Sequence, residues 1–473
     1  MSKSFFISVA FAVLLSGCAT TQMGLASSNA LPNLSVSMPA AWEGSSESAA
    51  KGAGDRITLK ADQIGWLNKF DDTVLTDLVA QAYTHNPNLK RLQARLDRAE
   101  GLSSKAKSGL LPAIDAALGA SRIDGFEGEN KSSASLNAGL DITWDADLWG
   151  RIAASSRASN LRSAAAQADY EAGQQLLAAS IVENYFLAIE ARRLARVSQN
   201  NLEALNKTLG FVTVQYQRGL RSGQDISLIR ADVASAKVAY NRAEGAARDA
   251  LRALEILIGT YPETSRAMTG VLPGVPKLVA IGQPANVLSQ RPDIQAAQYR
   301  VEAAYAAHKS TKAAQRPNLS LGGVIGSSSS SLGQLFDPSA MASTLFANLT
   351  APIFDGGSRK ADVAIAQADI NEALANYQDV VLTGLRDVER QIDDGQILLL
   401  QETELMQALS DARDALRFTQ FRYESAESDL LNVLQVQQRV SFIEAQLVST
   451  RRARLVQYIN LALALGVEPS SAL

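Results

Sequence analysis

Few side chains in this sequence could carry out chemistry. The chain of 473 residues contains one cysteine, Cys18, and two histidines, His85 and His308. Neither histidine has the neighbours of a metal-binding motif, and no catalytic triad or phosphate-binding loop is recognisable for them to serve. The sequence therefore predicts no enzyme, no metal site and no cofactor, and it predicts structural roles for both histidines.

Cys18 follows a segment with the features of an export signal. Lys3 precedes an apolar run at residues 5–15, which small residues follow, as in a secretory signal peptide. About ten apolar residues are too few for a helix that crosses a bilayer. Residues 15–18, Leu-Ser-Gly-Cys, resemble the bacterial lipobox, in which the signal is cut before the cysteine and that cysteine is acylated. This resemblance implies a lipid on Cys18, and Ala19 after it implies sorting to the outer membrane of a Gram-negative bacterium.

The remaining chain has no strong charge bias. It is 47% hydrophobic and 20% charged, with a net charge of −3, which allows large cores and argues against nucleic acid as a partner. No later stretch of 18 or more apolar residues follows the signal. If the mature chain enters the bilayer, we expect it to do so as strands.

Two intervals without proline predict long helices. Residues 113–261 and 353–468 lack proline and are rich in Ala, Leu, Gln, Glu and Arg. Each contains apolar residues in steps of three and four, which indicates coiled-coil packing: Leu202, Leu205, Leu209, Val212 and Tyr216, then Val433, Val436, Val440, Ile443 and Leu447. An unbroken helix from Gly150 to Tyr216 would be about 100 Å long. Turn-like segments at 217–225 and 423–431 interrupt the intervals, so each interval predicts an antiparallel helical hairpin.

The two halves of the chain repeat each other. Pro87 and Pro112 match Pro292 and Pro317 at one offset, 292 − 87 = 317 − 112 = 205. The helix, strand and turn patterns around these prolines follow in the same order. This agreement indicates an internal duplication.

Two alternating segments follow the second proline of each repeat. The alternation is strict at 135–145 and weaker at 113–121, 318–326 and 344–354, and polar loops at 122–133 and 327–339 join the segments into two hairpins. Each segment has about the length of a membrane-crossing strand. By themselves these strands fit a soluble four-stranded sheet on helices equally well. In lipid, four strands cannot close on themselves, so several copies must share one barrel, and three copies would supply twelve strands.

Similar turns lead from each strand hairpin into a helix. They read WDADLWGR (144–151) and IFDGGSR (353–359), and the tryptophans Trp144 and Trp149 fit an interfacial aromatic belt better than core packing. Other motifs are LSQRPDIQAAQYRVEAA (288–304), QYQRG (215–219) and FRYES (421–425). Together with the lipobox and the duplicated prolines, they make the chain resemble the TolC-type outer membrane factors, in the NodT-like lipoprotein branch.

The resemblance implies a mostly α-helical fold with membrane β-structure. It implies a homotrimer with a 12-stranded outer-membrane β-barrel, a coiled-coil helical barrel of about 100 Å and a mixed equatorial region. The implied function is passive: an exit duct of a tripartite efflux pump that conducts drugs or other small molecules. The implied partners are a periplasmic adaptor protein and an inner-membrane transporter, and the RPDI motif favours a transporter of the resistance-nodulation-division class.

The same resemblance implies how the chain is divided. The signal peptide covers 1–17, a lipidated arm and equatorial segment 18–72, the first repeat 73–267 and the second repeat 268–473, which includes a C-terminal equatorial end. The expected strands lie at about 113–145 and 318–354, and the expected helical hairpins at about 150–258 and 359–466.

Two sets of site residues are implied at the hairpin turns. The adaptor-contact set is Gly219, Ser222, Gly223, Ala426 and Ser428, and the periplasmic gate set is Leu431, Gln435, Asp429, Leu228 and Asp225. Gln435 stands where the family usually has an aspartate, and Ala426 stands where it usually has a glycine. Three copies of Leu431 could close a pore by dewetting, but a leucine at helical spacing also fits a helix seam, and both interpretations stay open.

Two other functions remain as alternatives. A duct of a type I protein secretion system would differ only in its partner, and the lipobox disfavours it by resemblance. A structural trimeric coiled-coil lipoprotein would have no conduit, and it would not need the duplicated strand hairpins.

Overall fold

The computed structural model describes residues 65–123, 133–264, 270–276, 288–425 and 427–467. The described residues all belong to one compact unit. Cys18, the signal segment and Ala426 lie outside the described residues. Within the described part, none of the helices combines the length and the apolar character that a membrane span requires.

In the residues that the structure describes, the first repeat contains four α-helices and two strands. They are α2 (Thr73–His85), α3 (Pro87–Ser108), β1 (Ala113–Ile123), β2 (Ser133–Ala146), α4 (Arg151–Gln217) and α5 (Gly223–Ile258), after the short 3-10 helix η2 (Asn68–Phe70). The carboxylate of Asp72 caps α2, and the side chain of Asn86 caps α3. Pro87 begins α3, where its missing N–H costs no hydrogen bond.

The second repeat has the same order of long elements. They are α7 (Pro292–Ala313), β3 (Asn318–Ser329), β4 (Met341–Thr350), α9 (Ser358–Glu424) and α10 (Leu430–Ala464), with the short helices α8 (Leu332–Leu335) and η3 (Pro338–Ala340) between the strands. Pro292 begins α7 as Pro87 begins α3. Helices α4 and α9 each contain 67 residues, which corresponds to about 100 Å, as the sequence predicts.

The four strands form one antiparallel sheet in the order β1-β2-β3-β4. The register aligns apolar side chains on one face, which confirms the predicted alternation: Ile142 lies opposite Ile114, Leu140 opposite Ile325, and Trp144 opposite Leu321. The other face carries polar side chains, among them Asp115 opposite Asp141. The outer edges of the sheet are β1 and β4.

The second strand hairpin differs from its prediction at two places. The last strand ends at Thr350 rather than at residue 354, because Pro352 has no N–H for the ladder. The predicted loop at 327–339 is partly ordered: β3 continues to Ser329, and α8 and η3 fill the connection.

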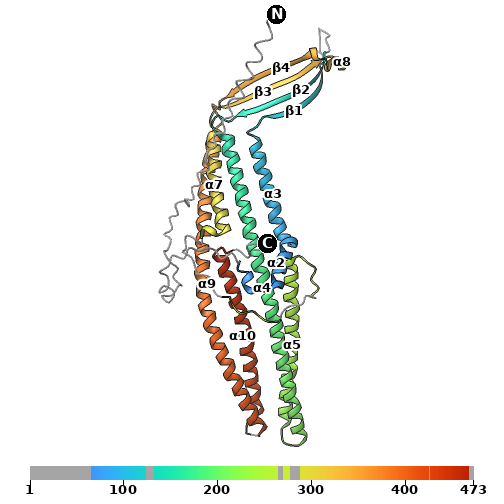
Figure 1. The fold of residues 1–473 in the computed structure, drawn as a ribbon, viewed down its shortest axis with the longest axis vertical. Coiled ribbons are helices and arrows are strands. Elements are labelled where there is room, and N and C mark those ends of the chain that lie inside the picture. Colours follow the sequence, from blue (N-terminus) through green and yellow to red (C-terminus); the bar gives the residue numbers. More distant parts are fainter. Residues whose placement is uncertain (1–64, 124–132, 265–269, 277–287, 426, 468–473) are drawn as a thin grey trace. The chain divides into compact units, whose positions relative to one another are not determined.

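The helices next to the sheet pack in the order of the strands that they join. Helix α3 packs on α4, α4 on α7, and α7 on α9, so this layer has α3 and α9 at its edges, as the sheet has β1 and β4. Helices α4 and α9 continue past α3 and α7 and turn back as α5 and α10, forming the two predicted hairpins (Figure 1).

Among the apolar clusters of the described residues, two join the first hairpin to the second. One joins α2, α4, α5 and α10 and includes edge-to-face contacts of Phe70 with Phe186 and Tyr458. The other lies near the hairpin turns and contains half of the predicted seam residues, with Leu205, Val212 and Val433 buried. Val440 and Leu447 of the second predicted seam are buried in a separate cluster between α9 and α10. Tyr216 is an exception in that seam, since its side chain is 47% exposed.

The two tryptophans of the WDADLWGR turn join the strands to the helices. The indole N–H of Trp144 donates to the Leu110 carbonyl at 3.0 Å, and that of Trp149 donates to the Pro317 carbonyl at 2.7 Å. Both side chains remain partly exposed. They therefore hold the C-terminal end of β2 against the residues before β1 and β3. Their place in an aromatic belt stays a prediction.

Candidate gate at the helical hairpin turns

The first hairpin turn depends on a glycine and a capping box. Gly219 has φ +72°, its N–H donates to the Tyr216 carbonyl, and the N–H of Leu220 donates to the Gln215 carbonyl. Glycine suits this left-handed position at a helix C-terminus because it has no Cβ. Ser222 then caps α5, its hydroxyl accepting from the Asp225 N–H while the Asp225 carboxylate accepts from the Ser222 N–H. The predicted contact residues Gly219, Ser222 and Gly223 thus lie within this turn and at the first residue of α5.

The second hairpin turn is held by contacts between its own residues. The N–H of Glu427 donates to the Arg422 carbonyl at 2.8 Å, and the Arg422 guanidinium donates to the Glu427 carbonyl at 3.3 Å. Ser428 accepts a hydrogen bond from the Asn432 amide. Asp429 caps α10 by position but makes no side-chain cap bond, and its side chain is exposed. Ala426, which stands where the family usually has a glycine, lies outside the described residues. How this alanine affects the turn therefore stays a prediction.

The first turn of α10 has a buried face and an exposed face. Leu430, Val433 and Leu434 are 2–3% exposed and belong to the apolar cluster near the turns. Leu431 is 51% exposed, and Gln435, four residues later on the same side of the helix, is also exposed. Leu431 therefore does not pack in the helix seam of its own chain, and it is free to contact another chain or a pore.

The other two predicted gate residues have local roles. Leu228 is half-buried and packs against the cluster near the turns. The Asp225 carboxylate is engaged by the backbone N–H and hydroxyl of Ser222. The structure thus gives these side chains packing and capping functions, and their part in a gate stays a prediction.

Sequence reasoning missed a contact that joins the two turns. The guanidinium of Arg221, in the first turn, donates to the Tyr423 carbonyl at 3.0 Å and lies 4.2 Å from the centroid of the Tyr423 ring. Tyr423 is 3% exposed and packs edge-on against Phe211. Burial raises the pKa of the Tyr423 hydroxyl, and the Arg221 charge opposes that shift. The sequence signal was that Arg221 and Tyr423 each lie within one of the two predicted turn segments.

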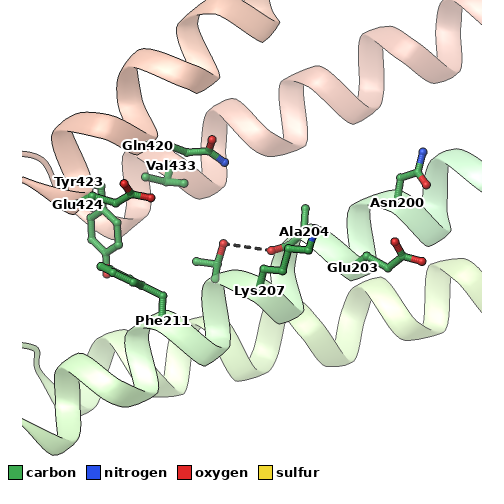
Figure 2. A pocket seen from close by; sticks show the side chains of 10 residues that line it. Asn200, Glu203, Ala204, Lys207, Phe211, Gln420, Tyr423, Glu424 and Val433 are labelled. Carbon is green, nitrogen blue, oxygen red and sulfur yellow. Dashed lines mark hydrogen bonds between the residues drawn. The ribbon is translucent and has the colours of Figure 1, made fainter.

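A cavity of about 520 Å³ lies between the two hairpins near these turns. Figure 2 shows Phe211 and Tyr423 at one end, with side chains of α4 facing those of α9 and α10. The lining combines charge with apolar surface: Asn200, Glu203, Ala204, Lys207, Thr208, Phe211, Gln420, Tyr423, Glu424 and Val433. Such a lining can accept both apolar and charged side chains of another protein.

Neither histidine belongs to this site. The His85 Nδ1 atom lies 2.9 Å from the Gln81 carbonyl oxygen within α2, and His308 is half-buried in α7. Among the residues that the structure describes, no group of three or more His, Cys, Asp or Glu side chains is placed to hold a metal ion.

The family match covers both repeats. A family model described as outer membrane efflux protein matches residues 78–260 and 284–467, well over half of the chain. The chain belongs to this family. The break between the matched segments falls between α5 and α7, where the first repeat ends and the second begins.

Relatives of this efflux protein extend over nearly its whole length. It is 28% identical to "Pyoverdine export outer membrane protein OpmQ" of Pseudomonas putida, over 92% of this chain and 93% of that protein. It is 26% identical to "Probable outer membrane lipoprotein SilC" of Salmonella typhimurium, over 85% of this chain and 87% of that protein. Its fold resembles the open-state crystal structure of the Neisseria gonorrhoeae MtrE outer membrane channel, with a TM-score of 0.78 and 26% identity, over 87% of this chain and 93% of that one.

The predicted TolC-like fold and the predicted function are thereby confirmed. The protein is an outer membrane efflux channel, and channels of this family work as trimers within tripartite pumps. Membership in this family removes the alternative of a structural coiled-coil lipoprotein without a conduit.

Proposed function

We propose that three copies of this efflux protein form one passive duct for drugs or other small molecules. The observation that carries this proposal is the four-stranded sheet with β1 and β4 at its edges. Unpaired strand edges are not tolerated in lipid, so the edges of neighbouring copies must pair. Three copies close a barrel of twelve strands. The duct itself has no catalytic activity, and the energy for export comes from the partner in the inner membrane.

The proposed gate consists of Leu431 and Gln435 from each of the three copies. Exposure of Leu431 beside three buried neighbours supports this placement. Three leucines around one axis can close a pore by excluding water, and three glutamines impose little charge selection. The Arg221–Tyr423 contact supports a closed arrangement, because it holds the turn of the first hairpin against the second.

The proposed adaptor-contact surface comprises the two turns and the cavity between the hairpins. The turns lie at the ends of α4 and α9 that are remote from the sheet (Figure 1). A periplasmic adaptor would bind there and join the duct to an inner-membrane transporter. The RPDI sequence at 291–294 supports a transporter of the resistance-nodulation-division class.

The proposed anchor is a lipid on Cys18. The lipobox at residues 15–18 supports it, as does similarity to a relative named as a probable outer membrane lipoprotein. Three acyl chains would hold the N-terminus on the membrane far more firmly than one chain does.

Reconstitution tests the proposed duct. We expect detergent-solubilised protein to be a trimer by native mass spectrometry, and we expect that trimer to conduct ions in planar bilayers. Four strands are too few to enclose a pore. A monomer that conducts ions, or a trimer that never conducts even after variants that open the gate, would contradict the proposal.

A further inference from the structure

The connection between β3 and β4, residues 330–340, carries apolar side chains although a polar loop is predicted there. It contains one charged residue, whereas the connection between β1 and β2, at 124–132, contains four. Leu335 is only 2% exposed, while Leu332 and Phe336 are 69% and 74% exposed. The two connections of the sheet therefore differ in chemistry, and the β3–β4 connection is the one that suits contact with lipid.

The β3–β4 connection folds back over the apolar face of the sheet. Its short helix α8 packs on β2 and β3. Ser327 lies opposite Ala138 and two residues beyond Ile325, so its side chain belongs to the apolar face. The Ser327 hydroxyl donates to the Leu335 carbonyl, and this hydrogen bond ties α8 down to the strand. The connection thus covers part of the face that the bilayer is expected to cover.

Hydrogen bonds within the connection satisfy backbone groups that lipid could not satisfy. The N–H of Ser331 donates to the Ser329 hydroxyl at 3.2 Å, and the N–H of Gln334 donates to the Ser331 carbonyl at 3.3 Å. The N–H of Asp337 donates to the Gln334 carbonyl at 3.2 Å. Hydrocarbon offers no partner to a backbone polar group, so irregular backbone at membrane depth must find its partners within the protein. These bonds therefore allow the connection to lie in the hydrocarbon layer.

A cavity of about 420 Å³ lies between the connection and the strands. Large and small apolar side chains from both sides line it: Ala116, Leu118, Leu140, Ile325, Leu335 and Phe336. Among its lining residues, all of which the structure describes, none is charged, and the one hydroxyl, that of Ser327, is already engaged by Leu335. A cavity of this size can hold a small ligand. Its lining offers that ligand apolar contact and no free polar side chain, so the matching ligand is a hydrocarbon.

The cavity lies near the end of the sheet that is remote from the helices. Strand β3 begins at Asn318, directly after α7, and runs away from that helix. Ile325, which lines the cavity, lies 325 − 318 = 7 residues along β3, or about 23 Å at about 3.3 Å per residue. A strand tilt of about 40° reduces this to about 18 Å along a barrel axis, within the outer half of an apolar band about 25 Å tall. In a barrel whose helices extend into the periplasm, this depth belongs to the outer leaflet.

We propose that this cavity binds one acyl chain of an outer-leaflet lipid and that α8 holds the chain against the sheet. The cavity is continuous with the apolar face of the sheet, where acyl chains are the hydrocarbon at hand in an outer membrane. Exported compounds would pass along the opposite, polar face, so they do not reach it. This inference rests on the proposed barrel and adds a lipid-binding site to its outer surface.

Native mass spectrometry of the full-length protein tests lipid retention. Delipidated trimer incubated with dipalmitoylphosphatidylethanolamine should retain one lipid per copy, and dipalmitoylphosphatidylglycerol should be retained equally, because the chain and not the headgroup is bound. Ala116→Phe should lower retention by at least about tenfold, because the added ring takes the space of several buried methylenes. Ala347→Phe is the matched control, since Ala347 is also an exposed alanine on the apolar face of an edge strand but lies outside the cavity.

Four results would overturn the lipid site. Equal retention by the two variants would show that the cavity does not hold the lipid, and retention of only one headgroup class would show that the chain is not what is recognised. Unchanged retention together with loss of the trimer in Ala116→Phe alone would assign the cavity to the next copy of the protein. A parent trimer that retains no lipid would remove the site and leave the duct intact, whereas a parent that forms no trimer would overturn the duct and the site together.

Fluorescence quenching tests separately whether the connection lies in lipid. Phe336→Trp places a reporter beside the cavity, and Leu345→Trp places one on the open apolar face of β4. In vesicles of phosphatidylcholine brominated along its acyl chains, both reporters should be quenched equally, after subtraction of the parent, which has four tryptophans. Leu220→Trp is the control, since Leu220 is also exposed (65%) but lies in the first hairpin turn, and only water-soluble acrylamide should quench it.

The two reporters separate the lipid site from the barrel. Quenching of Leu345→Trp by the brominated chains, with Phe336→Trp quenched by acrylamide alone, would place the connection in water and overturn the lipid site while the barrel stands. Quenching of neither reporter by the brominated chains would show that the apolar face of the sheet is not in the bilayer, which would overturn the proposed barrel as well.

Discussion

At the scale of single residues, the start of α10 shows how adjacent leucines take different roles. Leu430 is buried against the cluster near the turns, whereas Leu431 is half exposed beside it. The side chains of adjacent helical residues point about 100° apart, so a narrow apolar seam can hold only one of the two. The buried leucine stabilises the hairpin, and the exposed one is available to the pore.

Substitution at the proposed gate should change conduction more than stability. Leu431→Ser should raise single-channel conductance in planar bilayers, because it wets the narrowest ring, and it should change the free energy of unfolding by no more than about 0.5 kcal/mol, as expected for an exposed site. Gln435→Asp should increase cation selectivity by placing three carboxylates around the axis. If both variants are folded trimers that conduct like the parent, the gate lies elsewhere.

Substitution of the only cysteine should abolish lipidation. Cys18→Ser removes the thiol that the lipobox presents, so radiolabelled palmitate should be incorporated into the parent protein and not into the variant. Barrel formation should survive, because the strands insert through their own apolar face. Label in the serine variant would reject Cys18 as the acylated residue.

At the scale of elements, one end of α10 is tied to three other helices by arginines. Arg451 and Arg454 both contact the Glu402 carboxylate of α9, and Arg452 forms an ion pair with Glu190 of α4. The RPDI motif adds Arg291 at the start of α7, whose guanidinium donates to the Ala464 carbonyl at the end of α10. The Asp293 carboxylate holds that guanidinium through two hydrogen bonds. These contacts fix this end of the second hairpin against α4, α7 and α9.

Acid should weaken the contact between α9 and α10. Burial by itself would raise the pKa of Glu402, but hydrogen bonds and charges from Arg454 and Arg451 outweigh it and lower the pKa below its ordinary value of 4.5. A lowered pKa in the folded chain means that these ion pairs stabilise it fully above the ordinary value and lose their effect as the pH falls through the lowered one.

Glu402→Gln tests this dependence on pH. At neutral pH the variant should be less stable by about 1–3 kcal/mol, since two arginines lose a charged partner in a partly buried site. The stability difference between parent and variant, measured by thermal unfolding, should shrink as the pH falls below the ordinary carboxyl pKa. Asp414→Asn is a control, because the Asp414–Arg417 pair lies within one exposed helix face. A constant difference at all pH values would contradict the assigned role.

At the scale of the whole molecule, the efflux protein is incomplete as a single chain. Large apolar side chains remain exposed on both edges of the sheet, among them Leu118 at 78% and Leu345 at 86%. Large apolar side chains that are exposed together on a sheet mark a surface that contacts another chain or lipid. Both partners are expected here, because neighbouring copies cover the edges and the bilayer covers the apolar face.

Assembly with an adaptor should occur at the hairpin turns. Photoreactive or cysteine-directed crosslinkers at Ser222 and Ser428 should capture a periplasmic adaptor in cells, because each residue lies in a turn remote from the sheet. A crosslinker at Ser328, at the opposite end of the molecule in β3, is the matched control and should capture none. Capture at Ser328 alone, or at none of the three sites, would count against this placement. Capture of a component of a protein secretion system would instead favour the type I alternative.

The sequence alone determined the features that depend on local spacing. Proline positions bounded the long helices, and periods of three and four located most of the seam. The offset of 205 shared by two pairs of prolines revealed the duplication. These patterns are readable because helix and strand periodicities act over neighbouring residues. The last strand was placed too far along the chain because alternation continues through Ala351 and Pro352, although the ladder cannot. The domain boundaries stay a prediction.

Only the tertiary structure decided which distant residues meet. The order β1-β2-β3-β4, the hydrogen bond from Trp149 to Pro317 and the contact of Arg221 with Tyr423 join residues from different repeats. Helical period equally allowed Leu431 to be buried or exposed, and the packing of Leu430, Val433 and Leu434 against the first hairpin decided it. Contacts of this kind depend on which apolar faces pack together when elements far apart in the chain meet. Local sequence patterns do not specify that packing.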